Sequence, residues 1–188
     1  MSPTTPRVVR LCLDLNVFIA AELSKAAGRR DSASQLLVGY VEQGHSSLGP
    51  IQLVISQGML DRLEVRFHDA AGLSQENAAA LVTTLAELAR LGPAGLGRVM
   101  PVGTGVLPMR EPEDRGVLET ALAGRADLLV TANWRDFLFK DVDEITPGRV
   151  ARFRELILLH TAEAAGVLSR RRQLPPGIRG GEARMDSE

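Results

Sequence analysis

Two apolar runs that each end in polar residues stand out in the hydrophobic pattern of the chain. Residues 8–13 form an apolar run that suits a buried parallel strand, and Asp14 follows it directly. Residues 126–131 form a second such run, and Asn133 comes soon after it. In open α/β sheets, ligands bind at the carboxyl ends of the strands. If both strands run parallel in one sheet, their polar ends meet at one edge, which is therefore the candidate site.

The rest of the pattern alternates between helix and strand. It predicts helices over residues 17–23, 32–42, 58–68, 76–91, 116–123 and 149–167, and strands over residues 51–56 and 99–102. Ser56 and Ser74 stand where they can cap the helices that follow them. Strands that alternate with helices imply an α/β fold with a mostly parallel sheet covered on both faces.

The composition fits one globular domain and a reducing compartment. The chain has 188 residues, of which 45% are hydrophobic and 24% charged, enough for a full core. We expect a disordered N-terminus over residues 1–7, a domain over residues 8–168 and a flexible Arg/Pro/Gly-rich tail over residues 169–188. The single cysteine, Cys12, excludes an intramolecular disulfide. With no apolar stretch of membrane-spanning length and no signal-peptide core, a cytoplasmic protein without a membrane partner is expected.

Asp14 and Asp114 are the candidate metal ligands. Two carboxylates brought close together repel each other, and one takes up a proton unless a cation lies between them. Mg²⁺ and Mn²⁺ are hard ions that prefer such oxygen ligands, so we expect a divalent ion or an empty acidic pocket between these two residues. Asn133 and Asp136 would add a carbonyl and a carboxylate. Asp114 has an alternative role as the cap of the helix that follows it.

Three segments of the chain resemble PIN-domain ribonucleases. Those segments are LDLNVFIA at residues 13–20, VISQGMLDRLEVRF at residues 54–67, and EPEDRGVLETALAGRADLLVTANWRDF at residues 111–137. The resemblance covers roughly residues 8–160 and implies a three-layer α/β/α sandwich. It also implies an acidic cluster that holds Mg²⁺ or Mn²⁺ and cleaves single-stranded RNA. In this comparison Asp14 is the first acid of the cluster and Asp114 the third.

The chain departs from the family pattern at the second acid. Arg62 stands at the aligned position, with Asp61 and Glu64 on either side. Helical spacing turns Leu60, Leu63 and Phe67 inward, which leaves Glu64 at the edge of the apolar face and Asp61 nearer to solvent. Glu64 is therefore the favoured substitute acid. An Arg62 side chain that points into the acidic pocket would overturn this choice and indicate a lower metal affinity.

Other residues are expected to support the acids. Asn133 replaces the fourth acid of the family, and Asp136 lies close to it in sequence. Thr131 ends the strand that leads to Asn133. Asn16 is interpreted as a turn-former that hydrogen-bonds the loop of Asp14.

The C-terminal part of the chain is basic and is the candidate RNA-binding region. Residues 149–184 contain eight arginines against three glutamates. Arg149, Arg152 and Arg154, at the start of the predicted last helix, would hold the phosphate backbone, and residues 170–172 are additional candidates. A solvated helix face and a flexible tail would produce the same charge. With one Trp, one Tyr and five Phe in the chain, base stacking is not expected to set specificity.

The acidic residues and the resemblance to PIN-domain ribonucleases together imply a metal-dependent endoribonuclease for single-stranded RNA. The resemblance further implies the toxin of a toxin–antitoxin pair, with a small antitoxin as partner, and a homodimer is the expected assembly. The main alternative is a catalytically impaired PIN-like module that binds RNA or protein. A haloacid-dehalogenase-like phosphotransferase is less favoured, because Asn16 stands where that family has its second aspartate.

Overall fold

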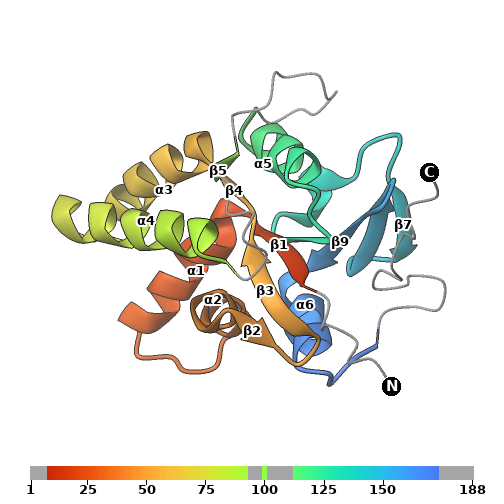
Figure 1. The fold of residues 1–188 in the computed structure, drawn as a ribbon, viewed down its shortest axis with the longest axis horizontal. Helices are drawn as coiled ribbons and strands as arrows, with labels where there is room; N and C mark the ends of the chain where they lie inside the picture. Colours follow the sequence, from red (N-terminus) through yellow and green to blue (C-terminus); the bar gives the residue numbers. More distant parts are fainter. Residues whose placement is uncertain (1–7, 93–98, 101–111, 174–188) are drawn as a thin grey trace.

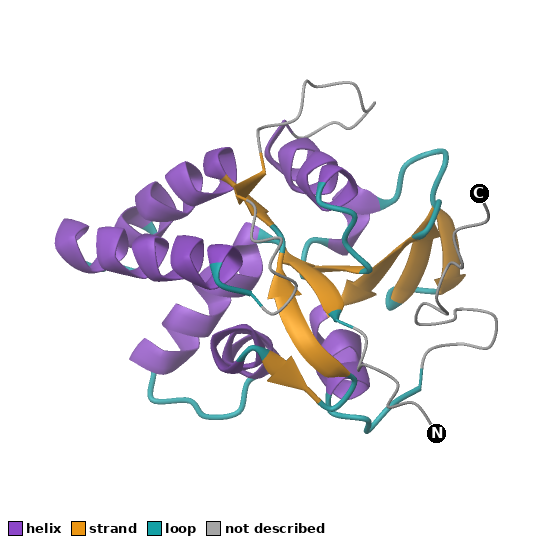
Figure 2. Cartoon of the chain, in the orientation of Figure 1, coloured by secondary structure: helices purple, strands orange, loops and turns teal. Residues whose placement is uncertain are grey.

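A sheet with helices on both sides makes up the computed structural model, which describes residues 8–92, 99–100 and 112–173. The helices are α1 (Leu15–Ala26), α2 (Ala33–Gln43), α3 (Gln57–Asp69), α4 (Gln75–Arg90), α5 (Pro112–Ala123) and α6 (Thr161–Leu168), with a 3₁₀ turn η1 (Trp134–Phe137). The strands are β1 (Val9–Leu13), β2 (His45–Ser46), β3 (Gly49–Leu53), β4 (Ile55–Ser56), β5 (Val99–Met100), β6 (Leu128–Thr131), β7 (Asp143–Thr146), β8 (Val150–Phe153) and β9 (Leu156–His160). This arrangement is the expected α/β/α architecture (Figures 1 and 2).

The main sheet has the strand order β2-β3-β1-β6-β9-β8-β7. Strands β3, β1, β6 and β9 run parallel to one another in its centre. Strand β2 on one side, and strands β8 and β7 on the other, continue the sheet with antiparallel pairing. Helix α5 packs on β1, β4 and β6, and α6 packs on β6 and β9. The central strands are therefore buried and nearly continuously apolar, as parallel strands with two covered faces must be.

Serine caps begin several of the helices. The side chains of Ser56 and Ser74 accept hydrogen bonds from the N–H groups of Met59 and Asn77, which confirms both predicted caps. Ser32 and Gln35 form a reciprocal capping box at the start of α2. Within the described residues, no helix is both long and apolar enough to cross a membrane.

The predicted helix over residues 149–167 is wrong. The structure has β8, β9 and the short helix α6 in its place. Residues 156–159 are all buried, and a short continuous apolar run fits a buried strand as well as a helix. Arg154 adopts a left-handed backbone conformation, with φ of 57°, which makes the tight turn between β8 and β9.

Other predictions from the sequence differ from the structure only in detail or lie partly outside the described residues. The predicted loop over residues 43–50 contains β2 and the start of β3. The strand expected over residues 99–102 is observed as β5, Val99–Met100, and the remainder lies outside the described residues. The expected N-terminal segment over residues 1–7 and most of the expected tail also lie outside them.

Gly124, directly after α5, lies so close to the sheet that it has no room for a side chain. A Cβ atom placed there would lie 2.2 Å from Cγ1 of Val54 and 3.2 Å from the carbonyl oxygen of Thr120. We expect Gly124→Ala to lower the free energy of unfolding by about 1–3 kcal/mol, because the core must shift to admit the methyl group.

Urea denaturation measures this effect, and Gly39→Ala is the matched control. Gly39 lies inside α2, where an added Cβ meets only the Gln43 side chain at 3.8 Å. The control is expected to be neutral or stabilising by up to about 1 kcal/mol, since alanine is the better helix former. Equal stability changes in the two variants would contradict the packing argument.

Candidate acidic site at the sheet edge

The carboxyl ends of three neighbouring strands form the candidate site. Leu13 in β1 pairs with Val130 in β6, and Thr131 in β6 pairs with His160 in β9. Asp14 follows Leu13 directly. The residues that end β1, β6 and β9 therefore lie in adjacent positions along one edge, as the apolar-to-polar pattern of two of these strands predicts.

Asp14 is a buried carboxylate held by the end of β6. Asp14 is 1% exposed, and its Oδ2 accepts a 2.7 Å hydrogen bond from Oγ1 of Thr131. Its backbone N–H donates to the carbonyl oxygen of Val130 at 2.9 Å. Although Asp14 precedes α1, its side chain makes no capping hydrogen bond to that helix. The hydrogen bond from Thr131 to this carboxylate is therefore made at the end of β6 and not at helix α1.

Asn133 connects Asp114 to the same group. Its side-chain Nδ2 donates to Oδ2 of Asp114 at 3.2 Å, and its backbone N–H donates to Oγ1 of Thr131 at 2.9 Å. Asp114 is 4% exposed and lies in the first turn of α5, where a carboxylate also complements the helix dipole. A continuous chain of hydrogen bonds therefore joins Asp14, Thr131, Asn133 and Asp114.

The donors in this chain suit a weakly held divalent ion. Asp14 and Asp114 supply carboxylate oxygens, and the bond from Nδ2 leaves the carbonyl oxygen of Asn133 outside the contact with Asp114. Mg²⁺ is commonly held by one or two carboxylates and keeps several waters. Among the described residues there is no cluster of three or more His, Cys, Asp or Glu side chains placed to hold a metal. The pair fits a hydrated ion rather than a cage made entirely of protein ligands.

Cys12 is not a ligand of this site. It is buried in β1, and its Sγ donates to the carbonyl oxygen of Val117 at 4.0 Å. Burial, and to a smaller extent the charge of Asp14, raises the pKa of the Cys12 thiol far above its ordinary value. Since only the thiolate binds metal or acts as a nucleophile, this thiol has a structural role.

Arg62, at the position aligned with the second acid, extends from α3 to α5. A Cβ atom on Gly116 would lie 3.0 Å from Nη2 and 3.3 Å from Nη1 of Arg62, so the guanidinium lies against the start of α5. Gly116 comes two residues after Asp114 in that helix. A positive charge therefore lies against α5, the helix that carries Asp114, and it comes from the position where the family carries a negative charge.

The structure does not bring Glu64 to the acids through any described contact. Residues 62 and 64 are about 200° apart around the axis of α3, so Glu64 lies on the flank opposite the side that faces α5. Asp61 is exposed and accepts a 2.8 Å hydrogen bond from Gln57. Leu60, Leu63 and Phe67 are buried, as expected. The preference for Glu64 as a substitute acid is thus not supported, because Arg62 is the residue directed toward α5.

Asn16 and Asp136 lie near the pair without a described bond to it. Asn16 is exposed in the first turn of α1, and its expected hydrogen bond to the loop of Asp14 stays a prediction. Asp136 is half-buried in η1, and its backbone N–H donates to the carbonyl oxygen of Asn133 at 3.3 Å. Asp136 therefore helps to shape the turn that presents Asn133.

The three predicted RNA-binding arginines do not form one patch. Arg149 directly precedes β8 at the site edge, where the N–H of His160 donates to its carbonyl oxygen at 2.9 Å. Arg154 lies in the turn at the opposite end of β8, with its guanidinium 5.2 Å from the ring centroid of Phe153. Arg152, inside β8, forms an exposed ion pair of 3.6 Å with Asp143. The expected grouping on one helix is wrong, because these residues lie along a strand.

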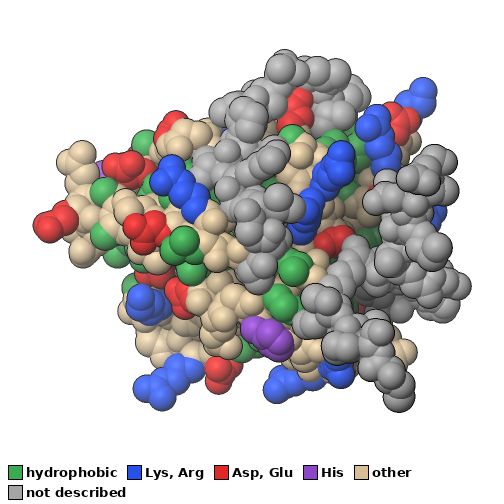
Figure 3. Space-filling view, in the orientation of Figure 1, with side chains coloured by type: hydrophobic (Ala, Val, Ile, Leu, Met, Phe, Trp, Pro, Cys, Tyr) green, Lys and Arg blue, Asp and Glu red, His purple; other side chains and the backbone are tan. Residues whose placement is uncertain are grey.

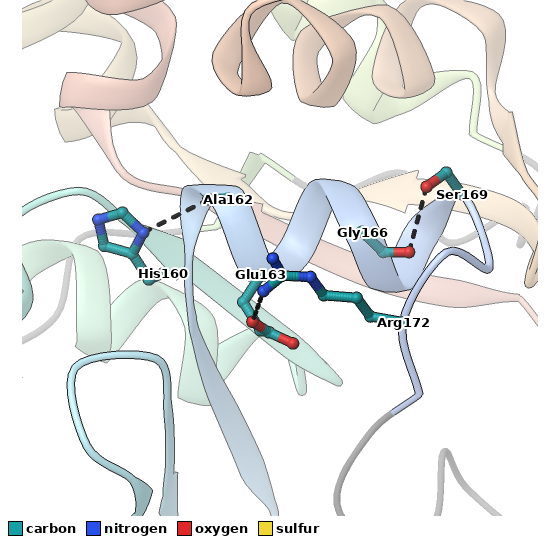
Figure 4. Close-up of polar contacts among 6 residues, drawn as sticks. All are labelled: His160, Ala162, Glu163, Gly166, Ser169 and Arg172. Carbon is teal, nitrogen blue, oxygen red and sulfur yellow. Dashed lines mark hydrogen bonds and ion pairs between the residues drawn. The ribbon is translucent and has the colours of Figure 1, made fainter.

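The remaining basic charge is also dispersed. Arg172 packs back along α6 and pairs with Glu163, at a point where Gly166 leaves room for it (Figure 4). On the face seen in Figure 3, lysines and arginines are spread over several elements rather than gathered in one patch. Of the arginines proposed for RNA, the described contacts place Arg149 at the site edge.

Two features of the site were not predicted. Oγ1 of Thr120 donates to the carbonyl oxygen of Gly116 at 2.6 Å and lies 2.9 Å from Oγ of Ser56, a hydrogen bond between two hydroxyls that joins α5 to the start of α3. His160 ends β9 beside Thr131. Residues 156–159 followed by His160 repeat the apolar-to-polar pattern of the other two strands, and this signal could have identified the histidine.

Glu144 holds η1, the turn that follows Asn133, against the hairpin formed by β7 and β8. Its Oε1 accepts hydrogen bonds from the N–H of Gly148 at 2.8 Å and from Nε1 of Trp134 at 2.9 Å. The bond from Gly148, and next the bond from Trp134, lowers the pKa of the Glu144 carboxyl below its ordinary value of 4.5. The folded state is therefore stabilised relative to the unfolded state wherever this carboxyl is ionised in both.

This pKa shift predicts a pH-dependent difference between wild type and Glu144→Gln. Because the folded pKa is the lower one, the stabilisation is fully present above about pH 4.5 and is lost as the pH falls through the folded pKa. The gap in Tm between wild type and variant should be constant at neutral pH and should narrow in acid. Asp141→Asn, an exposed acid in the same segment, is the control. A gap that stays constant from pH 7 to pH 3 would contradict the assignment.

Comparison with known proteins agrees with this geometry. A family model described as the PIN domain matches residues 10–135, which is more than half of the chain and includes Asp14, Asp114 and Asn133. No curated protein and no solved structure gave a match. PIN domains are generally nucleases and typically use divalent metals. The matched segment, the fold and the linked acids lead to one conclusion: this chain belongs to the PIN-domain family.

Proposed function

We propose that this chain is a metal-dependent endoribonuclease that cleaves single-stranded RNA. The observation that carries the proposal is the hydrogen-bonded chain Asp14–Thr131–Asn133–Asp114 at the carboxyl edge of the sheet. Two buried carboxylates held in fixed positions are an arrangement that a divalent cation stabilises. Membership of a family of nucleases supports hydrolysis of a phosphodiester as the reaction.

Each residue of the chain has a distinct part in this mechanism. Asp14 and Asp114 would bind Mg²⁺ or Mn²⁺ directly, and the bound ion would activate water and stabilise charge on the phosphate. Thr131 fixes the rotamer of Asp14 through its hydroxyl. Asn133 fixes Asp114 through its amide and Thr131 through its backbone N–H, so each ligand is oriented by a hydrogen bond from a neutral donor.

Cleavage of an unstructured RNA oligonucleotide tests the proposal. We expect cleavage with Mn²⁺ or Mg²⁺, none with EDTA, and a loss of about 100-fold or more in Asp14→Asn and Asp114→Asn, since the ion supplies several kcal/mol. Asp61→Asn is the matched control, because Asp61 is an exposed acid on α3 bonded to Gln57. Activity that survives EDTA or both substitutions would refute the mechanism.

The second candidate function is a catalytically impaired PIN module that binds RNA. Arg62 favours it, because its guanidinium lies against α5, the helix that carries Asp114, and a positive charge on that helix opposes the binding of a cation to its carboxylate. RNA binding by wild type without cleavage under any metal condition would select this function over the nuclease.

We also propose a biological setting, the toxin of a toxin–antitoxin pair in the cytoplasm, acting as a homodimer. The support is the resemblance to PIN-domain ribonucleases, many of whose bacterial members are toxins neutralised by a small antitoxin. Growth arrest on expression, relieved by co-expression of the reading frame immediately upstream, tests the toxin role. If growth is unaffected but the protein cleaves RNA in vitro, the chain is a nuclease and the toxin role is wrong.

A further inference from the structure

The acidic edge continues across two more strands, to His160 and Arg149. Thr131, which donates to Asp14, is the register partner of His160 in the parallel strand β9. Val150 pairs with Leu159 in the antiparallel strands β8 and β9, so Arg149 lies opposite His160. Asp14, Thr131, His160 and Arg149 therefore follow one another along the edge, each at or directly beside the end of one of four neighbouring strands.

The strand register places these side chains on the same face of the sheet. Register partners in neighbouring strands project to the same side, because the side chains of a strand alternate. Cys12 and Leu129 are partners, as are Leu129 and Leu158, and Cys12 contacts α5 through its bond to Val117. By the same alternation, Asp14, Thr131 and His160, two residues further along these strands, project toward one face of the sheet.

His160 offers one ring nitrogen to a ligand. Its Nδ1 accepts a 3.4 Å hydrogen bond from the N–H of Ala162 at the start of α6 (Figure 4). In the neutral imidazole, the proton therefore resides on Nε2, which is left as a donor. His160 is half-buried and Arg149 is exposed, so both side chains can be reached from solvent.

We propose that His160 and Arg149 form a phosphate-contact site for the RNA strand, beside the acidic pair. A guanidinium donates paired N–H bonds to phosphate oxygens, and the imidazole N–H adds a neutral donor next to it. The RNA backbone would run along the sheet edge from Arg149 across His160 to Asp14 and Asp114. This inference rests on the proposed function, because it assigns the substrate contacts of the same site.

The hairpin of β8 and β9 provides an internal control for this site. Arg154 lies on the same hairpin but in the turn at the opposite edge of the sheet. A general attraction between a basic hairpin and RNA would depend on Arg154 as much as on Arg149, whereas a site at the acidic edge depends on Arg149.

Fluorescence anisotropy with a labelled unstructured RNA oligonucleotide, in EDTA, measures the contacts without cleavage. Arg149→Ala should weaken binding about tenfold and reduce the slope of log K against log salt by about one. His160→Asn keeps a good helix-capping side chain but removes the Nε2 donor, so binding should weaken severalfold at an unchanged salt slope. Arg154→Ala should bind like wild type.

The outcomes separate this inference from the proposed function. If Arg149→Ala and His160→Asn bind RNA like wild type, or if Arg154→Ala weakens binding equally, the inference is wrong even where cleavage depends on Asp14. If wild type does not bind RNA in EDTA, the inference is also wrong. If cleavage fails under every condition but the two variants weaken binding as stated, the inference holds and the chain is a binding module.

Discussion

Replacing Arg62 by glutamate is expected to tighten Mn²⁺ binding by about tenfold or more. The guanidinium of Arg62 lies against Gly116 of α5, the helix that carries Asp114, and its positive charge is expected to oppose a cation bound to that carboxylate. For an assumed separation of about 10 Å, a unit charge and a divalent ion interact by on the order of 3 kcal/mol at an effective dielectric constant of about 20. Removing this repulsion and adding a carboxylate therefore exceeds the 1.4 kcal/mol that corresponds to a tenfold change in affinity.

Isothermal titration with Mn²⁺ measures this change, and two further variants define its origin. Arg62→Gln removes the positive charge without adding an acid, so its affinity should lie between those of wild type and Arg62→Glu. Arg66→Glu makes the same charge change one turn along α3, at an exposed residue. Equal affinities in Arg62→Glu and Arg66→Glu would show that the net charge of α3, and not the position of Arg62, controls metal binding.

Thr131→Val is expected to lower the free energy of unfolding by about 2–3 kcal/mol. The hydroxyl of Thr131, which is fully buried, donates to the buried carboxylate of Asp14 and accepts from the N–H of Asn133. Valine keeps the shape but leaves both partners without this bond, and hydrogen bonds to charged groups are the costly ones to lose. Urea denaturation measures the loss.

Thr131→Ser is the matched variant for this effect. It keeps the hydroxyl and removes only a methyl group, so its stability should lie much closer to that of wild type. A serine variant as unstable as the valine variant would mean that packing of the methyl group, rather than the hydrogen bond to Asp14, accounts for the stability.

The residues of the acidic chain could be predicted because their signal is local. Asp14, Thr131 and Asn133 stand at or just after the ends of apolar runs, and the topology of a parallel sheet brings such ends together. The motif around Asp114 supplied the fourth residue. No knowledge of side-chain packing was needed to propose that these residues meet.

The misplaced arginines depended on information that a single sequence does not carry. The apolar residues 156–159 fit a helix or a strand equally, and the left-handed turn at Arg154 has no glycine to reveal it. A helix over residues 149–167 would have placed Arg149 and Arg154 close together. In the structure they lie at opposite ends of strand β8. The same error concealed His160.

The roles of Arg62 and Glu64 depended on where long side chains extend. Helical periodicity ranked Glu64 by its distance from the apolar face, and it gave the burial of Leu63 correctly. It could not show that the guanidinium of Arg62 crosses to α5 and lies against Gly116. That contact needs the packing of α3 on α5, which a pattern along one helix does not contain.

Mn²⁺ binding by wild type, Asp14→Asn and Asp114→Asn, counted by electron paramagnetic resonance, tests the central claim that these two carboxylates share one metal site. Wild type should bind Mn²⁺ weakly at a site that both single variants lose, while Asp61→Asn retains it. A Mn²⁺ stoichiometry and affinity that remain unchanged in Asp14→Asn and Asp114→Asn would contradict the shared site.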